Sequence, residues 1–141
     1  MTRVDFHTNI PDKVAYACRL ARKAYGASGK VVLLAADEAQ AAQLDEALWT
    51  FSDTDFLPHV MAGDALAAQT PIIVTASMSA PLPHTDILVN LGQSIPDGVD
   101  RFSRVFEIVS TDEQDAQEGR KRYVAYKKQS YPLTHFVAGQ S

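Results

Sequence analysis

The sequence has little cysteine, no long apolar run and no excess of basic residues. Cys18 is its single cysteine, which excludes an internal disulfide and a multi-cysteine zinc site. No apolar run approaches the roughly 20 residues that a membrane span needs. The first residues also lack the apolar segment of a signal peptide. These absences predict a cytoplasmic protein that has no membrane contact and no bound metal.

The charge balance also narrows the class of protein. The formal net charge is −4, from 13 basic and 17 acidic residues, which argues against a general affinity for nucleic acid. The 141 residues are 46% hydrophobic and 21% charged, an ordinary composition for a globular protein with a core of its own. Since no repeat or linker interrupts the chain, we expect a single α/β domain over residues 1–141.

Signatures of catalysis are missing as well. Gly26 and Gly29, with Lys30 after them, look like a phosphate loop but have two residues between the glycines instead of four. Val31 follows the lysine, and a helix precedes this loop where a strand is required. His7 ends the expected first strand, where α/β proteins often place functional groups, although an ordinary polar strand end is the simpler interpretation. We therefore predict no enzymatic activity and no cofactor.

Strand-like and helix-like patterns alternate in the first half of the chain. A short strand around Val4 and Phe6 precedes a helix with Pro11 in its first turn and Gly26 at its end. Four further runs are almost wholly apolar, as in strands buried on both faces: 31–34, 71–75, 86–91 and 104–109. We predict a three-layer α/β domain around a mainly parallel sheet. The middle strands lack clear helices between them, so a mixed sheet is the alternative.

The second predicted helix carries the only tryptophan of the chain. Asp37 is its expected N-cap, and one apolar stripe faces the core: Leu44, Ala47, Leu48 and Phe51. Trp49 falls more than a quarter turn from this stripe, beside Asp45. With Phe56 and Pro58 just downstream, it indicates a surface for a protein partner. Burial of the tryptophan under a second layer of the protein is the alternative.

The last predicted helix is rich in basic residues. A capping-box signature at 110–113 opens it, it extends to about Gln129, and the tail from Ser130 is expected to be irregular. Five of the chain's 13 basic residues lie within nine positions: Arg120, Lys121, Arg122, Lys127 and Lys128. Acidic residues at the start of a helix and basic residues at its end also suit the helix dipole, which is a purely structural explanation.

Aromatic residues interrupt this basic segment at helical spacing. Gly119, Tyr123 and Tyr126 form one stripe, and Arg120 and Lys127 border it. A cationic edge beside an aromatic stripe suits an acidic peptide with a free terminal carboxylate. It also suits single-stranded nucleic acid stacked on the tyrosines. The third alternative is a solvated helix end whose tyrosines pack on the sheet.

Three features together resemble the chi subunit family of bacterial DNA polymerase III. They are the run Leu-Asp-Glu-Ala-Leu-Trp at 44–49, the spacing of Phe56, Pro58, His59 and Gly63, and the pattern formed by Arg120, Tyr123 and Tyr126. The resemblance covers essentially the whole chain. It implies a small Rossmann-like α/β protein without catalytic activity that belongs to the clamp-loader complex.

The resemblance also implies two protein partners, and contact with DNA through these partners. One is the psi subunit, for which the implied contact residues are Trp49, Phe56 and Pro58. The other is the acidic C-terminal tail of single-stranded DNA-binding protein, which ends in phenylalanine. Its implied contact residues are Val109, Arg120, Tyr123 and Lys127.

Two positions depart from the family pattern at the tail site. Ala116 stands where a basic residue is expected four positions before Arg120, and Val124 stands where one is expected after Tyr123. Lys121, Lys127 and Lys128 lie nearby on the same helix and are the candidates to supply the missing charge.

Overall fold

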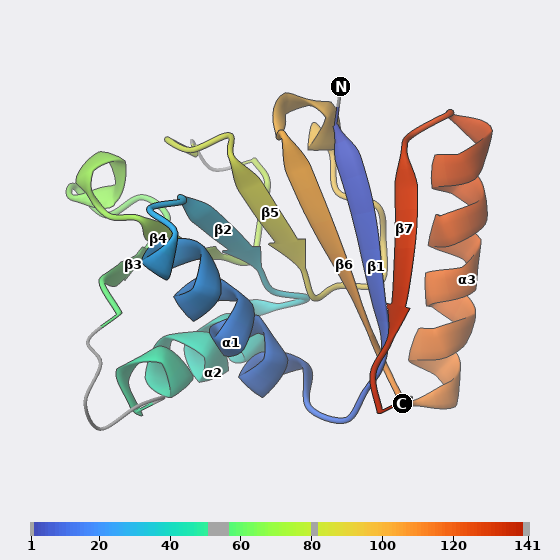
Figure 1. Cartoon of the computed structure of the whole chain (residues 1–141). Coiled ribbons are helices and arrows are strands. Elements are labelled where there is room, and N and C mark those ends of the chain that lie inside the picture. The colour runs from blue at the N-terminus through green and yellow to red at the C-terminus, as the bar shows by residue number, and fades with distance from the viewer. Residues whose placement is uncertain (1, 51–56, 80–81, 140–141) are drawn as a thin grey trace.

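The computed structural model describes residues 2–50, 57–79 and 82–139, and seven strands within them form one sheet (Figure 1). The strands are β1 (Arg3–Ile10), β2 (Val31–Leu34), β3 (His59–Met61), β4 (Ile72–Thr75), β5 (Ile87–Asn90), β6 (Arg104–Ser110) and β7 (Leu133–Val137). Their order is β3-β4-β2-β5-β6-β1-β7, and every neighbouring pair is parallel. The predicted α/β class is confirmed, and the alternative of a mixed sheet is wrong for these strands.

Helices cover both faces of this sheet and complete the three layers. Helices α1 (Lys13–Gly26) and α2 (Glu38–Thr50) bury Cys18 and Leu44 against one face. Helix α3 (Glu113–Lys128) and the short 3-10 turns η1 (Ala67–Gln69) and η2 (Val99–Arg101) cover the other. Figure 1 shows α1 and α2 in front of the sheet and α3 beside its β7 edge. No helix among the described residues is long and apolar enough to cross a bilayer.

Aspartates begin the three helices, as the capping rules require. Asp37 is the predicted cap of α2, and its carboxylate accepts a hydrogen bond from the backbone N–H of Gln40 at 2.8 Å. Asp12 caps α1, so Pro11 lies just before that helix instead of in its first turn. Asp112 caps α3, which therefore begins two residues later than a cap at position 110 predicts.

The C-terminal segment is a strand, so the predicted irregular tail is wrong. β7 pairs in parallel with β1, and the carbonyl of Pro132 accepts a hydrogen bond from the N–H of Val4 at 2.9 Å. Pairing satisfies the backbone groups that β1 would otherwise leave open at the sheet edge. β1 itself extends to Ile10, so His7 lies within the strand and not at its end.

A buried carboxylate joins α3 to the sheet. Glu107 of β6 is fully buried and accepts hydrogen bonds from Arg122 Nε at 2.9 Å and from the Tyr126 hydroxyl at 2.7 Å. Asn90 of β5 donates its amide to both carboxylate oxygens at 3.0 and 3.1 Å. Burial raises the pKa of Glu107, and these three donors oppose that rise because they favour the charged form.

Replacement of Glu107 by alanine is expected to lower the free energy of unfolding by about 3–5 kcal/mol, because it leaves the buried guanidinium of Arg122 without its counter-charge. Urea unfolding monitored by circular dichroism measures the change. Glu118→Ala removes a partly exposed ion pair with Lys121 and is the matched control, with an expected change within about 0.5 kcal/mol. Equal stability of the Glu107 variant and the parent would contradict the role assigned to this carboxylate.

Candidate functional site

A pocket of about 610 Å³ opens between α3 and the strands β1, β6 and β7. We call it the α3 pocket. Its apolar wall consists of Phe6, Val109, Ala116, Gly119, Tyr123 and Val124. Its polar rim consists of Thr8, Asn9, Ser110, Thr111, Arg120 and His135. The structure thus brings three predicted site residues, Val109, Arg120 and Tyr123, to one cavity.

Close packing of α3 on β6 forms the wall of this pocket. A Cβ atom on Gly119 would lie 2.7 Å from Val109 Cγ2, so the helix approaches the strand only because this residue is glycine. The rings of Phe6 and Tyr123 meet edge to face with centroids 5.2 Å apart. Because Phe6 is buried and Tyr123 half-buried, the tyrosine ring presents its remaining surface to the pocket.

Arg120 supplies the positive charge at the pocket mouth. Its side chain is 66% exposed, and Nη2 lies 3.7 Å from the Glu113 carboxylate, itself 81% exposed. An ion pair between two such exposed side chains is weak. The guanidinium is therefore available to a carboxylate that enters the pocket.

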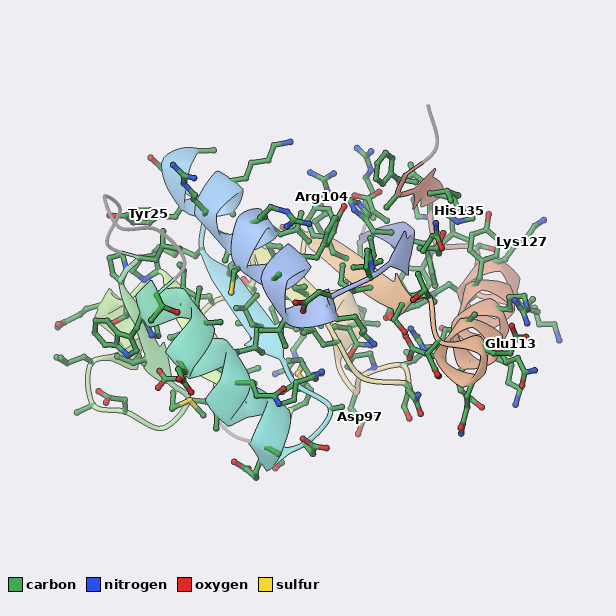
Figure 2. The ribbon with its side chains drawn as sticks, turned by 90° about the horizontal axis from the view of Figure 1, so that it is seen from below. Tyr25, Asp97, Arg104, Glu113, Lys127 and His135 are labelled. Atoms are coloured by element: carbon green, nitrogen blue, oxygen red, sulfur yellow. The ribbon has the colours of Figure 1, made fainter. Side chains whose placement is uncertain are left out.

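The other predicted aromatic and basic residues of α3 lie outside the α3 pocket. Lys127 is exposed and is not among the described residues that line the pocket, although it lies two helical turns from Arg120 on the same side of α3. Figure 2 shows Lys127 and Glu113 projecting from α3 at the end of the molecule. Tyr126 and Arg122 are buried on Glu107, so for Tyr126 the alternative of a tyrosine packed on the sheet is the correct one.

Sequence reasoning missed the part of the rim that the strands contribute. His135 of β7 is exposed, and its Nε2 lies 2.8 Å from the Thr8 hydroxyl of β1. Asn9 has a left-handed backbone with φ of 62° and donates its amide to the carbonyl of Ala138 at 3.0 Å. The available signal was the β-prone run 133–137, which has no clear alternation of apolar and polar residues.

Trp49 lies on the exposed side of α2, as predicted. Its side chain is 57% exposed, whereas Leu44 and Leu48 of the same helix are buried and Ala47 is half-buried. Pro58 is half-buried just before β3, and Phe56 and Phe51 lie outside the described residues. The structure therefore confirms the exposure of Trp49 outside the core face of its helix.

The ring of His59 packs against the ring of Trp49. The two rings meet with centroids 4.7 Å apart, and the histidine side chain is fully buried. Its Nδ1 lies 2.6 Å from the carbonyl of Leu57, and its Nε2 lies 3.2 Å from Asp45 Oδ1 without the angle of a hydrogen bond. These contacts fix the histidine ring, and the fixed ring limits the positions that Trp49 can take.

A second pocket, of about 810 Å³, opens at the carboxyl ends of β2, β4, β5 and β6, where Rossmann-like proteins commonly bind ligands. Its basic residue, Lys13, is 3.1 Å from Asp115 and therefore already paired. Asp97 and Asp112 add negative charge to the lining, which disfavours a phosphate. The described residues contain no group of three or more His, Cys, Asp and Glu side chains that could hold a metal ion.

Comparison with known proteins agrees with these features. The family model described as DNA polymerase III chi subunit, HolC, matches residues 1–134. The DNA polymerase III subunit chi of Pseudomonas aeruginosa is 39% identical over 138 residues, which cover 94% of each chain. The subunits chi of Haemophilus influenzae and Escherichia coli are 33% and 30% identical, over 84% and 82% of this chain and 82% and 79% of their own. The chain therefore belongs to the DNA polymerase III chi subunit family.

Proposed function

We propose that this protein is a non-catalytic accessory subunit of the bacterial DNA polymerase III holoenzyme, within the clamp-loader complex. It bridges the psi subunit and the acidic C-terminal tail of single-stranded DNA-binding protein, and it reaches DNA through these partners. The observation that carries the proposal is the exposed guanidinium of Arg120 at the mouth of an apolar pocket.

The α3 pocket has the chemistry that such a tail requires. A terminal phenylalanine ring fits against the apolar wall of Phe6, Val109 and Tyr123. Its α-carboxylate then lies within reach of Arg120, and a charge-assisted bond to a guanidinium is stronger than a bond between neutral groups. The hydroxyl groups of Thr8 and Thr111 offer further donors at the rim.

The acidic residues upstream of the phenylalanine need additional cations, since Ala116 and Val124 are uncharged. Lys121 is exposed and lies 3.3 Å from the half-buried Glu118, so its charge is partly compensated. Lys127 and Lys128 are exposed in the last turn of α3. The helix dipole is negative at this end, so the two lysines are the source of positive charge there. We assign these two lysines to long-range attraction of the tail and Arg120 to direct contact.

The Trp49 surface suits the psi subunit. A large, exposed aromatic side chain held by a buried neighbour is typical of the residues that dominate binding energy at protein interfaces. The surface adjoins β3, whereas the α3 pocket adjoins β7, the opposite edge of the sheet. At about 4.8 Å per strand these edges are about 29 Å apart, so both partners can bind at once.

The alternative function, a nucleic-acid-binding module built on α3, has less support. Single-strand binding by this helix requires accessible rings for stacking. Tyr126 is fully buried and Tyr123 is half-buried. Arg122 is buried and forms an ion pair with Glu107. The remaining exposed lysines give charge without a stacking surface.

Arg120→Ala is expected to weaken binding of a peptide that copies the acidic tail by about tenfold or more, because the terminal carboxylate loses its charged partner. Isothermal titration calorimetry measures the affinity. Affinity is also expected to fall with ionic strength, and an amidated peptide is expected to bind more weakly than the free acid.

Lys30→Ala removes an exposed positive charge from the loop before β2, away from the α3 pocket, and is the matched control. Its affinity for the peptide is expected to stay within about twofold of the parent at moderate salt. An Arg120 variant that binds the peptide as tightly as the parent would exclude the α3 pocket as the tail site.

Trp49→Ala is expected to weaken binding of the psi subunit by about 30-fold or more, as loss of a central aromatic contact commonly does. Surface plasmon resonance with immobilised psi subunit from the same bacterium measures the change. Leu66, also 57% exposed, gives the control variant Leu66→Ala, which is expected to keep its affinity. Trp49→Ala is also expected to bind the tail peptide normally, and an unchanged affinity for psi would reject this surface.

A further inference from the structure

On one face of the sheet, no helix among the described residues packs over the edge formed by β1 and β7. Helix α1 packs on β2 and β6, and α2 packs on β3 and β4, so both lie toward the β3 side of the sheet. Figure 1 shows β1 and β7 with no helix in front of them on the side of α1. We call this surface the open sheet face. Phe136 of β7 lies on it with 51% of its surface exposed.

A row of rings runs across the open sheet face from β7 to α1. The centroids of Phe136 and His7 are 5.5 Å apart, and those of His7 and Tyr16 are 5.4 Å apart. The Tyr16 hydroxyl is hydrogen-bonded to His7 Nδ1, and Phe106 packs edge to face beneath the histidine at 5.2 Å. These contacts hold the rings in place without covering Phe136.

The surroundings of the histidine in this row favour its uncharged form. Burial lowers the pKa of His7, and the nearby cations Arg104 and Lys23 lower it further, although Asp5 opposes them. A lowered pKa favours the neutral imidazole at pH 7. The row therefore presents aromatic surface along its whole length.

Positive charge surrounds the row. Arg104 Nε is 2.6 Å and Arg3 Nε is 3.1 Å from the carboxylate of Asp5, which is 97% buried at its side chain. Two guanidiniums that share one buried carboxylate keep a net positive charge at the surface. Arg19 of α1 adds another, 5.2 Å above the Tyr16 ring. The face is thus locally basic although the whole chain carries −4.

Figure 2 shows Arg104 on the same side of the sheet as α1, and His135 near α3. The parity of the strands agrees, because Arg104 stacks on Phe106 with 4.5 Å from Cζ to the ring centroid, and Phe106 belongs to the core under α1. Cations and rings therefore share one surface, and this surface is on the opposite face from the α3 pocket.

We propose that the open sheet face binds single-stranded nucleic acid. Bases stack on Phe136 and on the exposed part of Tyr16, and phosphates contact Arg3, Arg104 and Arg19. Rings on an open sheet bordered by cations are the general means by which proteins hold single strands without reading their sequence. A purely acidic protein segment would use the cations but not the rings, whereas a single strand uses both.

The proposal does not depend on the tail site in the α3 pocket. Occupation of both faces at once would hold a single strand beside the tail of the protein that coats it. Failure of one site would leave the other intact, because no described residue of the α3 pocket belongs to the open sheet face.

Fluorescence anisotropy of a labelled oligothymidylate of about 15 nucleotides, at about 50 mM salt, tests the proposal. The parent protein is expected to bind it. Phe136→Ala is expected to weaken binding by about tenfold, because a stacked base loses its partner. The double variant Arg3→Ala/Arg19→Ala is expected to lower the slope of log affinity against log salt by about 1.4, since each phosphate contact on a single strand contributes about 0.7.

Lys127→Ala/Lys128→Ala loses the same charge on the opposite face and is the matched control. It is expected to bind the oligonucleotide with the slope reduced by less than about 0.3. The acidic tail peptide is expected to leave the bound oligonucleotide in place. Circular dichroism verifies that each variant is folded.

Three results would overturn the proposal. The first is no binding of the oligonucleotide by the parent protein at low salt. The second is equal loss of affinity in the control and in the open-face variants, which would place the site on α3. The third is that the parent protein binds a glutamate-rich peptide containing aromatic residues but does not bind the oligonucleotide. If Phe136→Ala abolished that peptide binding, the face would be assigned to an acidic protein segment.

Discussion

The buried carboxylate of Glu107 determines how α3 sits on the sheet, and the α3 pocket depends on that orientation. Arg122 and Tyr126 are four positions apart, so both point from one side of the helix toward the same carboxylate. This fixes the rotation of α3 about its axis. Tyr123 and Arg120 are then turned toward the flank that faces β1 and β7. An ion pair with no contact to a ligand thus positions the residues that would meet one.

Glycine at 119 adds the second constraint. A helix anchored by long side chains such as those of arginine and tyrosine could sit farther from its sheet, but Val109 approaches the helix backbone directly at this point. The close approach brings Gly119 and Val109 together in the lining of the pocket, next to the packed rings of Phe6 and Tyr123. A rigid pocket favours binding, because less free energy is lost in ordering its side chains when a ligand enters.

Patterns along the chain predict the parts of this structure whose environment is uniform. Apolar runs locate β2 and β4 because both faces of a central strand are buried, and the period of α2 locates Trp49 outside the core. β7 is not predicted because the residues of this edge strand are exposed or half-buried on both faces. Its sequence therefore shows no alternation of apolar and polar residues. The partner of Arg122 lies 15 residues away, so periodicity cannot single it out among five basic residues; the signal available was Glu107, an acid inside an apolar run.

The side chains at the carboxyl edge of the parallel sheet are largely paired with one another. In a Rossmann-like protein this edge offers unpaired backbone and side-chain groups to a ligand. Here those groups satisfy one another: burial raises the pKa of Asp115, but the Ser110 N–H and the Lys13 ammonium outweigh it and hold that pKa below its usual value. Asn90 likewise accepts from the N–H of Gly92 while donating to Glu107. The described residues of this edge thus form an internally paired network, and the binding surfaces that we propose lie instead on α2, α3 and the open sheet face.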